Sequence, residues 1–151
     1  MAIQYVMHVG ICVRDLERSV RFYRDGLGFE EAGGLEISGE PTATLVEIPD
    51  LELRAVYLER DGLRIELLQF SSPGTVGSAE RRPMNQPGLT HFAIRVDNLD
   101  DTLAKLAPLG ANILEHTRVH EEAFDAHIIY ITDPDGTRLE VIETPKDPTR
   151  P

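Results

Sequence analysis

The chain has 151 residues, of which 41% are hydrophobic and 27% charged, which is typical of a soluble globular protein that forms one compact domain or two small half-domains. Its formal net charge of −11 disfavours nucleic acids and anionic membranes as partners, because both bind to concentrated positive charge. It contains no bilayer-spanning apolar run, no visible secretory signal and only one cysteine, Cys12, so we expect a cytoplasmic protein without an intrachain disulfide.

The first half of the chain predicts a strand, a helix and three further strands. Alternating apolar residues predict the first strand over 4–13. Asp15 is suited to cap a helix over 16–25, whose apolar residues recur with a period near 3.6, and Gly26 favours its end. Further strands are expected at 42–49, 52–60 and 64–70. The dipeptide Asp61-Gly62 predicts a two-residue hairpin turn between the last two.

The second half repeats this order. A strand is expected over 91–96, followed by a helix that Asn98 caps and that continues to Leu106 before Pro108 ends it. Strands are then expected at 112–119, 126–132 and 137–143. The turn sequence from Asp133 to Gly136 separates the last two.

These elements predict two modules with a segment between them. The expected divisions are a first βαβββ module at 1–70, an inter-module loop at 71–88, a second βαβββ module at 89–144 and a flexible tail at 145–151. The loop is rich in Ser, Pro and Gly and is too long for a simple connector, so it is either a linker or a lid. The tail holds three prolines.

The two halves also share a sequence repeat. The segment His8–Val13 (HVGICV) matches His91–Val96 (HFAIRV), and Asp61–Leu68 (DGLRIELL) matches Asp135–Ile142 (DGTRLEVI). Each half therefore contributes one histidine near its start and one glutamate near its end. These residues are His8, Glu66, His91 and Glu140.

Strand periodicity predicts that these four side chains point away from the helices. Side chains alternate across a strand, so the bulky apolar neighbours of each His and Glu face the opposite way and pack on the helices. A single His on a strand is more often a surface or hydrogen-bonded residue than a ligand, and a single Glu is usually solvated. Because both types recur at matched places, we favour a divalent metal site, which would neutralise the paired carboxylates.

The sequence resembles the vicinal-oxygen-chelate superfamily, which includes glyoxalases, bleomycin-resistance proteins, extradiol dioxygenases and methylmalonyl-CoA epimerase. The resemblance covers about residues 4–143, and its motifs are His8 with Val9-Gly10-Ile11, Phe22-Tyr23 with Leu27-Gly28-Phe29, Glu66-Leu67-Leu68, His91 with its strand, and Asp133-Pro134-Asp135-Gly136 leading to Glu140. It implies an α+β fold in which the modules form one curved, mostly antiparallel open-barrel cup. It also implies metal ligands at His8, Glu66, His91 and Glu140.

Two imidazoles and two carboxylates suit an octahedral divalent ion such as Co, Ni, Mn, Fe or Zn, with two positions left for a substrate. We therefore expect a metal-dependent isomerase or lyase that removes a proton next to a carbonyl, with Glu140 as the first candidate for the base and Glu66 as the second. Within this class the chain looks closest to methylmalonyl-CoA epimerase, with lactoylglutathione lyase as the alternative. The expected substrate is a small molecule, a thioester or a thiol conjugate, and the expected assembly is a homodimer.

Two other functions stay open at this stage. An extradiol ring-cleaving dioxygenase would use His8, His91 and Glu140 as ligands, with His127 and Tyr130 as candidates for contact with the substrate. A ligand-binding resistance protein would use the cup without catalysis. His116 and His120 are four residues apart, but their segment resembles strand and loop, so we expect them on the surface.

Overall fold

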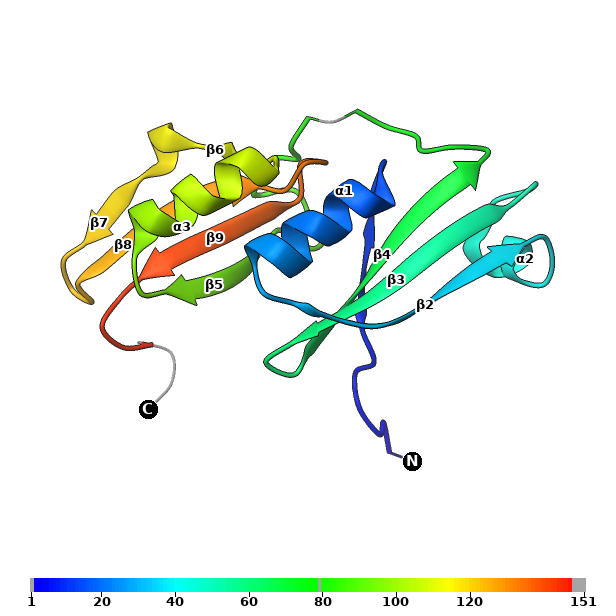
Figure 1. Cartoon of the computed structure of the whole chain (residues 1–151), viewed down its shortest axis with the longest axis horizontal. Coiled ribbons are helices and arrows are strands. Elements are labelled where there is room, and N and C mark those ends of the chain that lie inside the picture. The colour runs from blue at the N-terminus through cyan, green and yellow to red at the C-terminus, as the bar shows by residue number, and fades with distance from the viewer. Residues whose placement is uncertain (1, 79, 148–151) are drawn as a thin grey trace. The chain divides into compact units, whose positions relative to one another are not determined.

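The computed structural model describes residues 2–78 and 80–147, and the chain divides into two compact units, Met1–Ser78 and Ala79–Pro151 (Figure 1). The first unit contains β1 (Val9–Cys12), α1 (Leu16–Arg21) with a π-helical turn (Phe22–Gly26), β2 (Glu30–Ser38), α2 (Thr42–Val46), β3 (Glu52–Arg60) and β4 (Leu63–Ser72). The second contains β5 (Phe92–Val96), α3 (Leu99–Leu106) with a 3-10 turn (Ala107–Leu109), β6 (Asn112–Ile113), a 3-10 turn (Glu115–Thr117), β7 (Val119–Glu121), β8 (Ala126–Thr132) and β9 (Arg138–Glu143).

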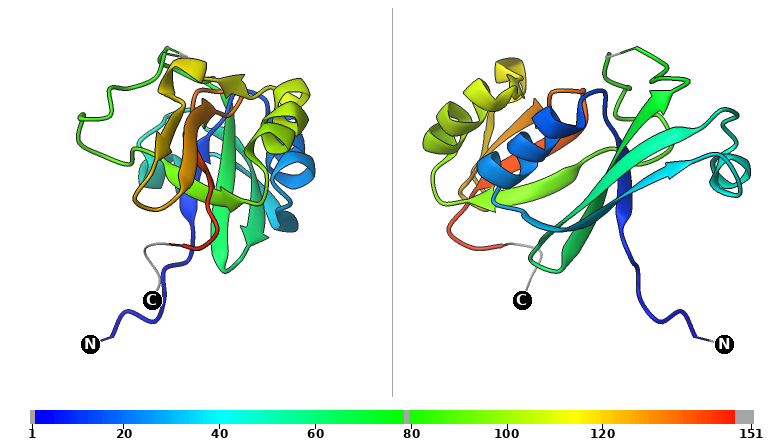
Figure 2. Two further views of the ribbon diagram at one scale, coloured as in Figure 1. Left: turned by 90° about the vertical axis from the view of Figure 1, so that its left-hand side faces the viewer. Right: turned by 45° about the vertical axis from the view of Figure 1, so that its right-hand side comes forward.

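Each unit forms one open, mixed sheet with the same topology. The strand order is β1-β4-β3-β2 in the first unit and β5-β9-β8-β6 in the second, where β7 also pairs with β8. The outer pairs β1–β4 and β5–β9 are parallel, and the other pairs are antiparallel. Figure 2 shows β2, β3 and β4 as long neighbouring ribbons. The α+β class and the two βαβββ modules are therefore as predicted.

The core of each unit lies between the helix and one face of its sheet. On β4 the side chains of Ile65 and Leu67 are 1% and 0% exposed, and on β9 those of Leu139 and Val141 are both 0% exposed. Helix α1 contacts β3 and β4, and α3 contacts β9. The residues that alternate with these apolar side chains, Glu66 on β4 and Glu140 on β9 among them, point to the opposite face of the sheet.

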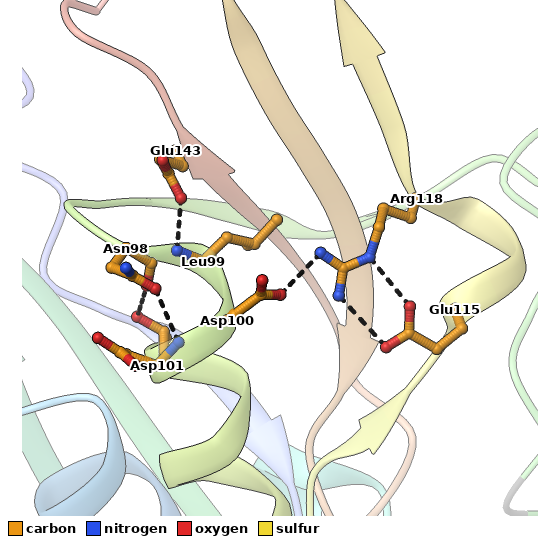
Figure 3. A network of polar contacts seen from close by, with 8 residues as sticks. Asn98, Leu99, Asp100, Asp101, Glu115, Arg118 and Glu143 are labelled. Carbon is orange, nitrogen blue, oxygen red and sulfur yellow. Dashed lines mark hydrogen bonds and ion pairs between the residues drawn. The ribbon is translucent and has the colours of Figure 1, made fainter.

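Each helix is tied at its first turn to the strand that carries the glutamate. The predicted caps are confirmed, because the side chains of Asp15 and Asn98 accept hydrogen bonds from the backbone N–H groups of Arg18 and Asp101, at 2.9 and 2.8 Å. A second side chain comes from the sheet. Gln69 of β4 accepts from the N–H of Leu16 at 2.9 Å, and Glu143 of β9 accepts from that of Leu99 at 2.6 Å (Figure 3). Gln69 and Glu143 lie three residues after Glu66 and Glu140, so the repeat extends to these contacts.

The predicted strand at 42–49 is wrong, since part of this segment forms helix α2 and the second strand of the module is β2. A short apolar run does not by itself distinguish a strand from a helix. Ala43 of α2 packs into a small cluster with Leu51 and Leu53, and this contact favours the helix. Strand β2 shows apolar alternation only at Leu35 and Ile37, because most of the strand is exposed at the sheet edge and it contains Gly33 and Gly34. A Cβ atom at Gly34 would lie 2.8 Å from the carbonyl oxygen of Ala55 on β3, so this close approach requires glycine.

Two other strands differ from their predicted extent. The predicted strand at 4–13 is limited to β1, since Val9 pairs with Ile65 and the partner strand begins at Leu63. The predicted strand at 112–119 is interrupted by the 3-10 turn at Glu115–Thr117, so β6 and β7 pair with different parts of β8. The hairpin turn at Asp61-Gly62 is confirmed, and both residues have positive φ, 51° and 82°.

Among the described residues, none between 73 and 91 belongs to a helix or strand, and the role of 71–88 as a lid stays a prediction. Of the predicted tail at 145–151, positions 148–151 lie outside the described residues. In the part of the chain that the structure describes, no helix is long and apolar enough to span a membrane.

Candidate functional site

His8 and Glu66 contact one another in the first unit. Glu66 lies on β4 opposite Gly10 of β1, and His8 is two residues before Gly10. Because side chains two residues apart share a face, the imidazole comes to the same side as the carboxylate. His8 Nε2 lies 3.0 Å from Glu66 Oε2, and the side chains are 30% and 13% exposed.

His91 and Glu140 repeat this arrangement in the second unit. Glu140 lies on β9 opposite Ala93 of β5, and His91 is two residues before Ala93. His91 Nε2 lies 3.2 Å from Glu140 Oε2, and the side chains are 26% and 21% exposed. Thr90 Oγ1 lies 3.0 Å from the other ring nitrogen of His91. The fold thus brings together one histidine and one glutamate in each module.

Tyr57 is a member of the first site that sequence reasoning missed. It faces Glu66 across the β3–β4 hairpin, and its hydroxyl donates to Glu66 Oε1 at 2.6 Å. Its ring meets that of His8 edge to face, with centroids 5.5 Å apart. The hydrogen bond to Glu66 raises the pKa of Tyr57 to about 12, burial and the Glu66 charge act in the same direction, and Arg64 opposes them. Glu66 is therefore held at both of its oxygens.

Tyr130 is the equivalent residue of the second site. It faces Glu140 across the β8–β9 pair, and its ring meets that of His91 edge to face with centroids 5.3 Å apart. Burial is the main cause that raises the pKa of Tyr130, followed by the charge of Glu140. In each module an arginine guanidinium also lies 5.9 Å from the tyrosine ring centroid, Arg64 over Tyr57 and Arg138 over Tyr130.

Cross-strand pairing could have identified Tyr57 from the sequence, but not Tyr130. Arg64 and Arg138 stand at the same place in the sequence repeat, two residues before each glutamate. Counting back across the turn at Asp61-Gly62 places Tyr57 opposite Glu66. The second turn is longer, so the same sequence offset does not lead to Tyr130, and only the strand register relates the two tyrosines.

His127 lies away from this site. It pairs with Glu143 across β8 and β9, on the face where Glu143 contacts the α3 N-terminus, and it stacks on His120. Tyr130 lies three residues further along β8, on the opposite face with Glu140. Of the two candidates for contact with a substrate, His127 and Tyr130, only Tyr130 therefore lies on the face of Glu140 and adjoins His91.

The two pairs fit a divalent cation in their donor chemistry. Two ligand atoms that each lie about 2.1 Å from one ion, at a right angle, are about 3.0 Å apart, close to the separations in both pairs. His8 Nδ1 is buried and has no hydrogen-bond partner among the described residues. The other ring nitrogen, Nε2, is the one that faces Glu66 Oε2, so the fit of an ion rests on that contact and not on Nδ1. Hydrogen bonds to metal-binding carboxylates are also usual, and Tyr57 supplies one to Glu66.

The second unit also has an open cavity of about 980 Å³. Tyr130 and Arg138 line it together with His116, Arg81 and Thr132. His91 and Glu140 are not among the lining residues, and the cavity is related to this pair through Tyr130, whose ring meets that of His91. Its volume is in the upper part of the range for small-molecule sites, about 300–1,000 Å³.

Comparison with known families decides the classification of this chain. Residues 5–141 match the model of the Glyoxalase/Bleomycin resistance protein/Dioxygenase superfamily. The chain belongs to this superfamily. Its members, also called vicinal-oxygen-chelate proteins, are mostly metal-dependent enzymes. A specific closeness to methylmalonyl-CoA epimerase is not borne out by the relatives found.

Among curated proteins, the chain is 30% identical over 140 residues to a catechol-2,3-dioxygenase of Bacillus subtilis. The match covers 89% of this chain, but the chain spans only about 40% of the length of that relative. Among solved structures, it resembles a glyoxalase family protein from Bacillus cereus with a TM-score of 0.80 and 20% identity, over 95% of this chain and 96% of the other.

A glyoxalase I of Leishmania major matches with a TM-score of 0.63 and 20% identity, over 93% of this chain and 87% of the other. A fosfomycin resistance protein from Mesorhizobium loti matches with a TM-score of 0.60 and 20% identity, over 98% and 96%. At these identities the structures share the fold of this chain.

Proposed function

We propose that this protein is a divalent-metal-dependent isomerase or lyase that removes a proton from the carbon next to a carbonyl group. The observation that carries this proposal is the repeated contact between one imidazole and one carboxylate in each module, at 3.0 and 3.2 Å. With two imidazoles and two carboxylates as donors, one carboxylate could leave the ion to transfer a proton while the other three donors keep holding the ion. Membership of the superfamily supports a metal-dependent enzyme, and the carboxylates beside the histidines support proton transfer as the reaction.

The residues proposed to hold the ion are His8 and Glu66 of the first module and His91 and Glu140 of the second, and each pair is in contact within its own module. When bound, a divalent ion would supply Lewis-acid polarisation of the substrate carbonyl oxygen. His91 keeps its ring orientation through the contact with Thr90. The apolar side chains of β4 and β9 lie on the opposite face of each sheet and are buried, so they take no part in the site.

We assign the base to Glu140 and a purely ligating role to Glu66. Both oxygens of Glu66 are engaged, one by Tyr57 and one by His8, and its side chain is 13% exposed. Glu140 is 21% exposed, and its hydrogen bond with Tyr130 contributes less to the raised pKa of that tyrosine than burial or the Glu140 charge does. A base must reorient toward the substrate C–H, so the less constrained carboxylate suits this role. Glu140 would take the proton and return it to the same carbon or its neighbour.

The substrate class is a small carbonyl compound, with a thioester of the methylmalonyl-CoA type or a thiol conjugate of the lactoylglutathione type as the two candidates. Incubation of the metal-loaded protein with each candidate in heavy water tests the reaction. Exchange of deuterium into the position next to the carbonyl supports the proposal. A metal-loaded protein that exchanges no proton with either class would contradict it.

Matched variants separate the two glutamates. Glu140→Gln should lower kcat by about 10²–10⁴-fold, the usual contribution of a placed base, while metal is still bound at reduced affinity. Glu66→Gln should lower the bound metal first, as measured by elemental analysis. His91→Ala should also lose metal, and the exposed His116→Ala is the control that should keep it.

A second candidate function is extradiol ring cleavage, which the 30% identity to a catechol-2,3-dioxygenase favours. In that reaction His8, His91 and Glu140 alone would hold iron, and Glu66 would stay paired with Tyr57. Oxygen consumption with catechols by the iron-loaded protein, unaffected by Glu66→Gln, would select this function. Deuterium exchange with a thioester and no oxygen consumption would select the first.

A further inference from the structure

A second group of potential metal ligands lies on the β7–β8 hairpin, on the face of the sheet opposite Glu140. His120 of β7 pairs directly with His127 of β8, and Asp125 lies in the turn between the strands. His120 Nε2 is 3.1 Å from Asp125 Oδ1, and the two imidazole rings stack with centroids 4.3 Å apart. One ligand atom from each of the three residues lies within 4.8 Å of the others.

The local sequence explains why these three side chains converge. The cross-strand register sets the two histidines side by side on one face of the hairpin. Asp125 has a φ of 48°, a left-handed conformation that aspartate tolerates better than most residues, and this turns its carboxylate back toward His120. Within the turn, the N–H groups of Phe124 and Asp125 donate to the carbonyl oxygens of Glu121 and Glu122, both at 3.3 Å. The turn thus holds the backbone of Asp125 beside His120, while its exposed side chain stays free to rotate.

The charge around the group favours a cation. The turn sequence from Glu121 to Asp125 contains three carboxylates and no lysine or arginine. The nearest arginine in sequence is Arg118, which directly precedes β7 and lies two residues before His120. Its guanidinium bonds Asp100 at 3.0 Å and Glu115 at 3.0 and 3.3 Å, so two carboxylates neutralise it (Figure 3).

We propose that His120, Asp125 and His127 form a second binding site for a divalent transition-metal ion, separate from the site of the proposed function. Two imidazoles and one carboxylate are the donor set of open three-ligand zinc and iron sites. The stacked rings must splay for both nitrogens to reach one ion. This rotation is possible because all three side chains are exposed, with His120 43% and Asp125 75% exposed. The bound ion would join β7 to β8 next to the turn.

Zinc titration of the wild-type protein, followed by NMR of the histidine ring protons, tests this site one residue at a time. The chain has five histidines, so each ring signal can be assigned with a His→Gln variant. The signals of His120 and His127 should shift or broaden together as zinc is added, while His116, an exposed histidine outside the group, should not move in step with them. In His127→Gln, the zinc affinity measured from the His120 signal should fall at least about 10-fold. Loss of a residue that only hydrogen-bonds a metal ligand already costs about that much, and loss of a ligand should cost more.

The outcomes are distinct from those of the proposed function. Zinc that shifts only the signals of His8 and His91 would refute the hairpin site and leave the first metal site intact. A His120 shift that persists unchanged in Asp125→Asn and in His127→Gln, or a His127 shift that persists in His120→Gln, would also refute it, since zinc would then act elsewhere. These three side chains are exposed, so their variants should fold, and circular dichroism before titration checks this.

Discussion

The raised pKa of Tyr57 makes a quantitative prediction about the first site. The hydrogen bond from its hydroxyl to Glu66 Oε1 is the largest cause of the shift, from 10.0 to about 12. The substitution Glu66→Gln removes the charge of the acceptor but keeps its size. The pKa of Tyr57 should then fall back toward 10 in the metal-free protein.

The size of the effect follows from the shift. Two pKa units correspond to about 2.7 kcal/mol of preference for the protonated phenol. Tyr57 is only half-buried, and solvent screening reduces this value, so we expect about 1–2 kcal/mol in the free energy of unfolding. Because the folded-state pKa lies above the unfolded-state value, this stabilisation is complete below pH 10 and is lost as the pH rises from about 10 to about 12.

The assay is a spectrophotometric titration of phenolate in chelator-treated protein. The chain has four tyrosines, so Tyr57→Phe identifies the transition that belongs to Tyr57. The matched comparison is Glu140→Gln, read through Tyr130. Burial is the first cause of the Tyr130 shift, so this substitution should change the pKa of Tyr130 less than Glu66→Gln changes that of Tyr57.

Two results would refute this reasoning. One is a Tyr57 transition near pH 10 in the wild type, which would mean that the hydroxyl does not donate to Glu66 in solution. The other is a transition near pH 12 that Glu66→Gln leaves in place, which would assign the shift to burial.

The remaining predictions concern stability and are read from chemical denaturation. Leu139→Ala should lower the free energy of unfolding by about 2–5 kcal/mol, since the side chain is 0% exposed, and a loss under 1 kcal/mol would show that the α3–β9 core repacks freely. Glu143→Ala should cost about 1–2 kcal/mol by freeing the N–H of Leu99, whereas Glu143→Gln should cost less because Gln69 makes the equivalent contact in the first module; equal losses would argue against the hydrogen bond. Gly62→Ala should cost about 1–2 kcal/mol, from its φ of 82° alone, because no heavy atom outside its chain neighbours lies within 4 Å of the added Cβ, and an unchanged stability would contradict the left-handed turn.

The features that depend on local pattern and on repetition could be predicted from the amino-acid sequence. The match of Asp61–Leu68 with Asp135–Ile142 identified two modules, and alternation along each strand placed the glutamates opposite the apolar residues. The helix caps at Asp15 and Asn98 followed from residue type and position. The caps and the alternation depend only on neighbouring residues, and the repeat is visible by comparing two segments of the same sequence, so none of them requires knowledge of the folded structure.

Other features were decided only by tertiary contacts. Strand β2 is an exposed edge strand with little hydrophobic signal, and its place depends on pairing with β3. Helix α2 forms where Ala43 meets Leu51 and Leu53. The role of Tyr57 and the convergence of His120 with His127 both depend on which residues face each other across a hairpin. Strand register is a long-range property, so the donors could be named from the sequence, whereas their hydrogen-bond partners required the folded sheet.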